Sequence, residues 1–279
     1  MSAGKVFVRE SGSGTRTVVL LHGYSDHGGT WCKVVPALAE RHRVLTVDLP
    51  GFGRSAGHWR APVLDHYVDT VAEVIADCAD PVALIGNSLG AVTSLAFAST
   101  YPGRVDGVVL ADMPGMAGIP RSWSSGARLP LDMVSRALSR PVPPALVQFA
   151  IATLYARAAL HRPDRLGVDT RTAFAANYAS RRSIETLLAV GRAVIPELAR
   201  LPIPEMVNSL SVPALLVWGE RDLITPARAA GRVHTGARRR VAIIPDAGHC
   251  PQLDSPSEFL ELVLPFLERS FSRPAAPGT

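Results

Sequence analysis

The strongest chemical signal in the sequence is a G-x-S-x-G pentapeptide, Gly86-Asn87-Ser88-Leu89-Gly90. It follows an apolar run at 81–85 and precedes a helical pattern, the strand–turn–helix setting in which such a serine is a nucleophile. A strand that turns sharply into a helix leaves no room for side chains two positions to either side of the serine, which explains both glycines. The turn would present the Ser88 hydroxyl at a helix N-terminus, where developing negative charge is stabilised. We therefore predict that Ser88 is a nucleophile rather than a simple helix cap.

A serine hydroxyl is a weak nucleophile, so it needs a base, and the base needs an acid to orient it. His249 follows an expected strand at 241–244, and Asp222 follows an expected strand at 214–218. The ends of parallel strands meet at one edge of a sheet, and the chain order of Ser88, Asp222 and His249 is that of nucleophile-elbow hydrolases. We predict His249 as the base and Asp222 as the acid.

Two other carboxylates compete for the role of the acid. Glu220 lies two residues before Asp222 and closer to the strand end, whereas Asp222 leads directly into the next helix, so Asp222 is preferred. Asp246 lies three residues before His249 and is expected to brace its own turn.

Acyl transfer also requires hydrogen-bond donors for the oxyanion that forms during the reaction. The backbone N–H of Leu89 comes directly after the nucleophile and is the first candidate. The second is expected in the loop His22-Gly23-Tyr24, after a strand at 17–21, and we predict the N–H of Tyr24. One such donor contributes about 3 kcal/mol to transition-state stabilisation.

The elements that must position these residues follow an alternating pattern. Strands are expected at 6–9, 17–21, 43–48, 82–85, 105–111, 214–218 and 241–244. Helices are expected at 31–41, 64–79, 89–100, from about Pro226, and at 255–269. Strands that alternate with helices indicate βαβ units and a mainly parallel sheet in an α/β fold.

The alternation stops between residues 113 and 205, where proline clusters and helical patterns occur without a convincing strand. This segment is too long for an ordinary loop, so we predict a helical cap inserted into the core. The predicted domains are a core at 1–112 and 206–271, a cap at 113–205, and a disordered tail at 272–279.

The composition is that of a globular protein with one large core. The 279 residues are 47% hydrophobic and 19% charged, enough for one α/β domain with an insertion. The formal net charge of +5 originates in residues 116–205, which hold 12 Arg against six acidic residues. No zinc-finger, RNP or KH motif accompanies this charge, so we expect no nucleic-acid partner.

Cysteine usage and apolar runs predict a cytoplasmic protein with no membrane association. The three cysteines, at 32, 78 and 250, have neither disulfide-framework nor metal-ligand spacing, which is typical of a reducing compartment. Residues 1–14 contain no apolar run, and the segment 145–160 is too short for a membrane span and includes two polar residues, Gln148 and Arg157.

Five segments in this order resemble the α/β-hydrolase fold superfamily: residues 22–24, 48–55, 86–90, 218–222 and 248–249. The resemblance implies a mostly parallel eight-stranded sheet with helices on both faces, a helical cap inserted after strand six, and neither cofactor nor metal. Matched residue by residue, it gives Ser88, Asp222 and His249 the catalytic roles and the N–H groups of Tyr24 and Leu89 the oxyanion hole.

The expected function is a cofactor-independent serine hydrolase that cleaves a small, largely apolar ester through an acyl-enzyme on Ser88. The expected partner is a small-molecule substrate, with a homodimer left open. Superfamily members with an Asp nucleophile are disfavoured by the serine at position 88.

Two alternatives remain. The Asn87-Ser88 pair resembles carbon–carbon bond hydrolases of ring-cleavage products, but the loop at 24–29 and Cys250 depart from their pattern, a Gly-Pro-rich loop and a Trp. The other alternative is a non-catalytic ligand receptor on the same fold.

Overall fold

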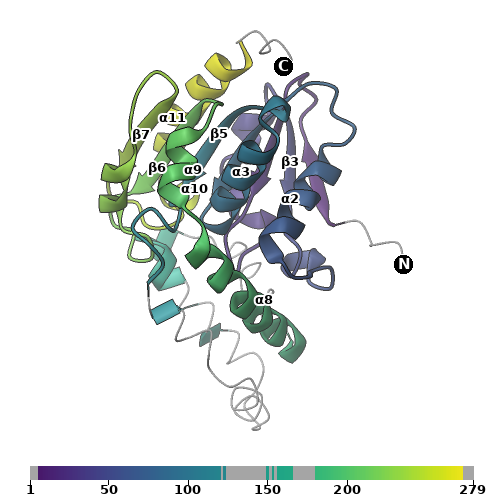
Figure 1. The fold of residues 1–279 in the computed structure, drawn as a ribbon, viewed down its shortest axis with the longest axis vertical. Coiled ribbons are helices and arrows are strands. Elements are labelled where there is room, and N and C mark those ends of the chain that lie inside the picture. Colours follow the sequence, from purple (N-terminus) through teal and green to yellow (C-terminus); the bar gives the residue numbers. More distant parts are fainter. Residues whose placement is uncertain are drawn as a thin grey trace.

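The computed structural model describes residues 6–120, 122–123, 149–150, 153, 156–165 and 180–272. These residues form a seven-stranded sheet with the strand order β1-β3-β2-β4-β5-β6-β7 (Figure 1). The strands are β1 (Val8–Ser11), β2 (Thr17–Leu21), β3 (Arg43–Val47), β4 (Val82–Asn87), β5 (Val105–Ala111), β6 (Ala214–Gly219) and β7 (Arg239–Ile244). Only the β1–β3 pairing is antiparallel, and the other pairs are parallel.

Helices connect the parallel strands and cover the sheet. The α-helices are α1 (Val35–Ala39), α2 (Val63–Val74), α3 (Leu89–Thr100), α8 (Arg181–Arg200), α9 (Ile203–Ser209), α10 (Pro251–Asp254) and α11 (Pro256–Phe271). The helix expected from Pro226 is a 3-10 helix, Ala227–Arg232, and that expected at 31–41 is divided between a 3-10 helix, Gly28–Trp31, and α1.

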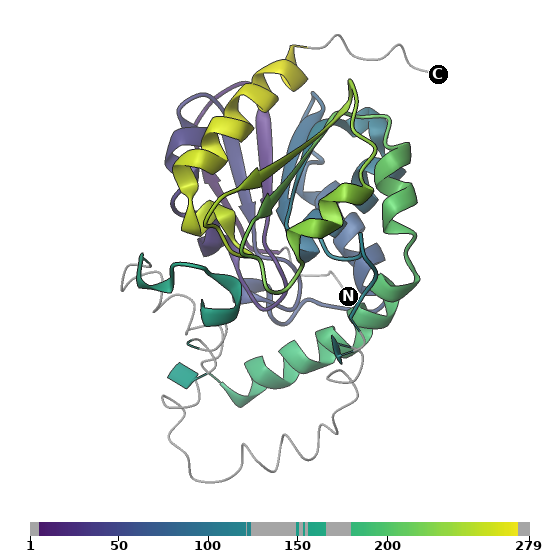
Figure 2. The same cartoon turned by 90° about the vertical axis from the view of Figure 1, so that its left-hand side faces the viewer.

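The core consists of two apolar layers, one on each face of the sheet. Val19 and Leu21 of β2 pack in the layer that includes α2, α3 and α9, whereas Val18 and Leu20 pack in the layer with α1 and α11. Figures 1 and 2 show α11 on one side of the sheet and α2 and α3 on the other. Because both faces are covered, every residue of β2 and β6 is buried, which explains their continuous apolar runs.

The seven strands predicted from sequence patterns are all present, and the eighth strand that the resemblance implied is not among the described residues. The long insertion lies between β5 and β6, the fifth and sixth of the described strands. Much of the predicted cap, and the tail at 273–279, lies outside the described residues.

The parallel ladder continues for one residue beyond the strands and brings their ends to one level. The N–H of Ser88, after β4, donates to the carbonyl of Ala111 at 2.8 Å, and the N–H of Asp112, after β5, donates to that of Val217 at 2.8 Å. The residues that follow β4, β5 and β6 are therefore neighbours. In the described part of the chain, no helix has the length and apolar character needed to cross a membrane.

Candidate active site

Ser88 lies at a tight turn between β4 and α3. Its backbone angles, φ 53° and ψ −114°, are in a region that residues with side chains rarely adopt, and Ser88 is only 8% exposed. A Cβ atom on Gly86 would collide with the carbonyl of Gly90, and a Cβ atom on Gly90 would collide with the carbonyl of Leu21. Both glycines are therefore required by the crowding of this turn, and the strained serine backbone is held by the elements on either side.

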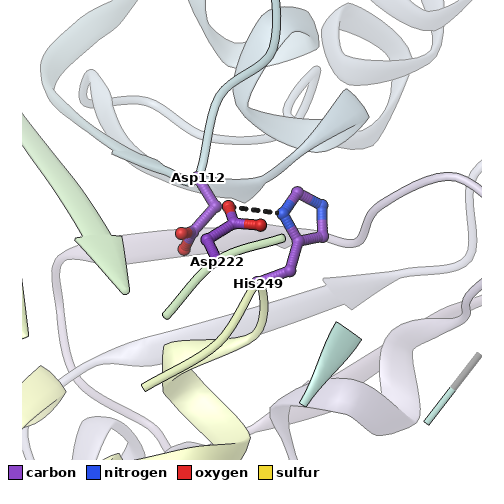
Figure 3. Close-up of side chains that lie close together, drawn as sticks. All are labelled: Asp112, Asp222 and His249. Atoms are coloured by element: carbon purple, nitrogen blue, oxygen red, sulfur yellow. Dashed lines mark hydrogen bonds and ion pairs between the residues drawn. The ribbon is translucent and has the colours of Figure 1, made fainter. Parts of the chain in front are cut away.

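His249 and Asp222 form a buried pair at the ends of neighbouring strands (Figure 3). His249 Nδ1 lies 2.9 Å from Asp222 Oδ2, and both side chains are almost fully buried. Since a carboxylate only accepts, Nδ1 carries the proton and donates it, which leaves Nε2 of a neutral imidazole free to act as a base. The loops after β6 and β7 thus meet as their strand-end positions predicted.

The carboxylate of Asp222 is fixed by its own loop. Its Oδ1 accepts from the N–H groups of Ile224 at 2.7 Å and Thr225 at 2.9 Å, and its Oδ2 accepts from the Thr225 hydroxyl at 2.5 Å. Burial would raise the pKa of Asp222, but the electrostatic interaction and hydrogen bond with His249 and the hydrogen bond from the Thr225 hydroxyl outweigh it, so the pKa lies below its usual value. Asp222 is therefore the ionised member of the pair.

The rival acids make other contacts. Glu220 pairs with Arg221 at 3.4 Å near the surface. Asp246 has a half-exposed side chain that pairs with Arg162 at 3.4 Å and with Arg221 at 3.9 Å. The preference for Asp222 over both agrees with this geometry.

The turn before His249 is braced by Asp254 of α10 and not by Asp246, and sequence reasoning missed this. Its Oδ2 accepts from the N–H of Gly248 at 2.7 Å and from the N–H of His161 at 2.8 Å. Asp254 therefore ties the His249 turn to residues 156–165 of the insertion. Nothing in the local sequence distinguishes it from an ordinary helix carboxylate.

Asn87 connects the serine turn to the histidine loop. Its Nδ2 donates to the carbonyl of His249 at 2.8 Å, and the Cys250 thiol donates to its Oδ1 at 3.7 Å. The structure therefore brings His249 and Asp222 into direct contact and joins Ser88 to His249 through the neighbouring residue. Burial raises the pKa of Cys250 well above its usual value, so its thiol stays protonated and lines the site.

The predicted oxyanion loop runs directly past Ser88. A Cβ atom on Gly23 would lie 3.2 Å from the Cβ of Ser88. The buried His22 ring donates from Nδ1 to the Gly23 carbonyl at 2.7 Å and accepts at Nε2 from the N–H of Leu49 at 2.9 Å, so it is neutral. Burial also lowers the pKa of His22.

This ring orients the second predicted donor. The carbonyl of Gly23 and the N–H of Tyr24 belong to the same peptide group, and in a planar trans peptide these two groups point in opposite directions. By holding the carbonyl, His22 fixes the direction of the Tyr24 N–H. Leu89, the other predicted donor, is the first residue of α3 and directly follows Ser88.

Helix α8, which belongs to the insertion, contacts the core at two residues. The Tyr24 hydroxyl donates to the Leu187 carbonyl of α8 at 2.6 Å. Farther along α8, the Glu197 carboxylate accepts from the N–H groups of Val63 and Leu64, each at 2.9 Å, at the start of α2. Helix α8 is therefore fastened at two points, one of them on the oxyanion loop.

Asp112 is a third carboxyl group at the site, and sequence reasoning missed it. It follows β5 with φ 45° and is fully buried, and its Oδ1 accepts from the N–H of Gly219 at 2.9 Å. Burial and the nearby charge of Asp222 raise the pKa of Asp112 well above its usual value. The signal was present, because Asp112 follows a buried strand just as Ser88 and Asp222 do.

Asp112, Asp222 and His249 also make up a set of side chains able to hold a metal ion. Their ligand atoms lie within 4.8 Å of one another, and they are the one such set in the part of the chain that the structure describes. Asp222 is already occupied by its hydrogen bonds to His249 and to the loop at 224–225, so a metal would have to displace them. We assign no metal to this set.

Known proteins of one family are similar to this chain. The sequence profile of the alpha/beta hydrolase family matches residues 18–262. The pimeloyl-[acyl-carrier protein] methyl ester esterase of Nitrosomonas europaea is 29% identical over 258 residues, which cover 91% of this chain and 96% of that protein.

Solved structures share the fold at lower sequence identity. A thermophilic esterase from Thermogutta terrifontis has a TM-score of 0.76 at 22% identity, covering 95% of this chain and 93% of its own. The enol-lactonase from Burkholderia xenovorans LB400 has a TM-score of 0.73 at 20% identity, covering 94% and 96%. With its family profile matched along most of its length, the chain belongs to the alpha/beta hydrolase family.

Proposed function

We propose that the protein is a cofactor-independent serine hydrolase that cleaves a small, largely apolar carboxylic ester. The observation that carries the proposal is the buried hydrogen bond between His249 Nδ1 and Asp222 Oδ2, in a loop that Asn87 ties to the Ser88 turn. It leaves an unprotonated imidazole nitrogen for the serine, as nucleophilic catalysis requires.

In the first half of the reaction, His249 Nε2 takes the proton from the Ser88 hydroxyl as its oxygen attacks the ester carbonyl. The N–H groups of Leu89 and Tyr24 stabilise the oxyanion, and Asp222 stabilises the imidazolium. His249 then gives its proton to the departing alcohol, which leaves an acyl group on Ser88.

In the second half, His249 takes a proton from water, and the resulting hydroxide attacks the acyl carbonyl through the same oxyanion site. Collapse of this intermediate returns the proton to Ser88 and releases the acid. Every proton transfer uses a group of this chain, so the mechanism needs no metal or cofactor.

The relatives support an ester as the first choice of substrate. The curated relative from Nitrosomonas europaea is named as a methyl ester esterase and aligns over nearly all of both chains. The carbon–carbon alternative relied on Asn87, and the bond from Asn87 to the His249 carbonyl gives that residue a structural role instead.

Hydrolysis of short p-nitrophenyl esters tests the proposal. Ser88→Ala should lower kcat by at least about a thousandfold, since the nucleophile is lost and the oxyanion donors remain. The matched control is Ser99→Ala on α3, whose hydroxyl bonds only to the Leu95 carbonyl at 2.8 Å, and its kcat should stay within about twofold. A fluorophosphonate probe should modify Ser88 in the wild-type protein.

Three results would contradict the proposal. Retention of activity in Ser88→Ala would remove the nucleophile from the mechanism. Turnover of a vinylogous diketone with little ester hydrolysis would favour carbon–carbon cleavage. Tight binding of a ligand with no turnover of either substrate would favour a receptor.

A further inference from the structure

The carboxyl group of Asp112 lies at the centre of the site, and its surroundings disfavour its ionised form. Asp112 is fully buried, and its Oδ1 accepts one hydrogen bond, from the N–H of Gly219. Its Oδ2 is buried and has no hydrogen-bond partner among the residues that the structure describes. An ionised carboxylate in this place would be a buried charge with half of its acceptor capacity unused, which is strongly unfavourable.

The neighbours of Asp112 make an ionised form still less favourable. One carboxylate oxygen of Asp222 lies within 4.8 Å of one of Asp112, and Figure 3 draws the two side chains close to each other and to His249. Asp254 adds a further negative charge from α10, and the Cys250 thiol is neutral. The remaining titratable neighbour, His249, is already paired with Asp222.

Two buried carboxyl groups this close together cannot both be ionised at low cost, so one proton held by either group would stabilise the pair. The donors decide which group holds it. Asp222 accepts from His249 Nδ1, from the Thr225 hydroxyl and from two backbone N–H groups, all of which favour its ionised form. Within the described part of the chain, the Asp112 carboxyl group accepts from one N–H group, that of Gly219.

We propose that Asp112 is a neutral carboxylic acid at neutral pH and donates its Oδ2–H to Asp222, which makes it a positioning residue for the Asp222–His249 pair. A single proton on Asp112 both satisfies the otherwise orphaned Oδ2 and turns a repulsive contact into a hydrogen bond. Thr225 supports the arrangement, because its hydroxyl lies 2.9 Å from the Asp112 carbonyl and also contacts the Asp222 carboxylate.

The arrangement has a consequence for the imidazole. His249 then faces one net negative charge rather than two, and Asp222 gains a hydrogen bond in addition to those from its own loop. The kinetic part of this inference rests on the proposed function, whereas the protonation state of Asp112 does not.

Infrared spectroscopy tests the proton directly, since the carbonyl stretch of a neutral carboxylic acid is separate from the bands of an ionised carboxylate. The difference spectrum between wild type and Asp112→Asn at pH 7 should show loss of a neutral-acid band. The control is Asp65→Asn, an exposed acid in the first turn of α2, which should show loss of carboxylate bands instead.

Kinetics and NMR test the donated hydrogen bond. Asp112→Asn keeps a donor for Asp222 and an acceptor for Gly219, and Asp112→Leu keeps neither. We expect kcat of the Leu variant to lie about ten- to a hundredfold below that of the Asn variant, the usual effect of a lost hydrogen bond to a charged group, with KM similar in both. The proton NMR resonance of His249 Nδ1–H should move more in the Leu variant than in the Asn variant.

The acidic limb of the pH profile of kcat/KM separates this role from a purely structural one. If Asp112 is neutral, Asp112→Asn removes no charge and leaves the apparent pKa of that limb in place. If Asp112 is ionised, the variant removes a negative charge close to His249 and lowers the apparent pKa by about one unit or more.

Several outcomes overturn the inference: loss of carboxylate bands in Asp112→Asn, a lowered pH limb, or equal kcat in the Asn and Leu variants. If a variant does not fold, a wild-type infrared titration decides, because the neutral-acid band should persist between about pH 5 and pH 8. If the neutral-acid band is present but esters are not hydrolysed, the inference that Asp112 is neutral is supported and the proposed function is refuted.

Discussion

Removal of the Asn87 side chain should weaken both the fold and the reaction, because this side chain ties the serine turn to the carbonyl of His249. The residue is 1% exposed, and its Nδ2 donates to that carbonyl at 2.8 Å. In Asn87→Ala the carbonyl loses this donor, and the thiol of Cys250 loses its contact with Oδ1.

The size of the effect follows from burial. A buried acceptor left without its partner costs about 1–3 kcal/mol, and the small cavity adds to this cost. The free energy of unfolding should therefore fall by about 2–3 kcal/mol. With an m-value of about 3 kcal/mol/M, the urea midpoint should fall by about 0.7–1 M. If half of this free energy is lost in positioning His249 for the transition state, kcat falls about tenfold.

Urea unfolding followed by circular dichroism and hydrolysis of p-nitrophenyl butyrate measure the two effects. Asn208→Ala is the matched control, because Asn208 also makes two hydrogen bonds, both to backbone groups, but lies at the protein surface; we expect a loss of about 0.5 kcal/mol or less. A midpoint and kcat equal to wild type in Asn87→Ala would refute the structural role given to this bond.

Three further predictions concern the same site. Asp222→Asn should lower kcat by about 10⁴, and it should also remove stability that wild type has above about pH 4 and loses as the pH falls through the lowered pKa of Asp222. Acid unfolding curves that coincide with wild type would contradict this. The raised pKa of Asp112 means that the folded state binds a proton that the unfolded state releases above about pH 4, so wild type loses stability from this group as the pH rises. Asp112→Asn should gain stability relative to wild type from pH 4 to 7 in urea titrations, and a constant difference would count against a neutral Asp112. Tyr24→Phe should lower the free energy of unfolding by about 1 kcal/mol through the lost bond to the Leu187 carbonyl, whereas no change in the urea midpoint would show that this bond is not formed in solution.

The fold was predictable where one local pattern determines one element. The run Thr17–Leu21 is apolar throughout because it is buried on both faces, and helix α3 follows Ser88 as the G-x-S-x-G setting predicts. The helix expected from Pro226 is present as a 3-10 helix, a distinction that helical spacing alone does not make. The eighth strand came from the resemblance and not from any pattern in this chain.

The site was predictable to the extent that it obeys the strand-end rule. Ser88 and Asp222 follow the buried strands β4 and β6, His249 follows β7, and the structure brings His249 into hydrogen-bond contact with Asp222. The rule was not extended to Asp112 after β5. The roles of Asn87 and Asp254 depend on contacts to residues 162 and 93 positions away in the chain, and such contacts leave no periodic mark in the sequence.

The hydrogen bond from Tyr24 to α8 limits which inserted segments from other proteins can replace the one in this enzyme. A graft that replaces the inserted segment with one from another protein also replaces the carbonyl that the tyrosine holds, 163 residues farther along the chain. The transplanted segment has to offer a backbone acceptor at the same place, or the tyrosine has to be exchanged with it. The compatibility of a chimera would thus be decided by a residue outside the swapped piece.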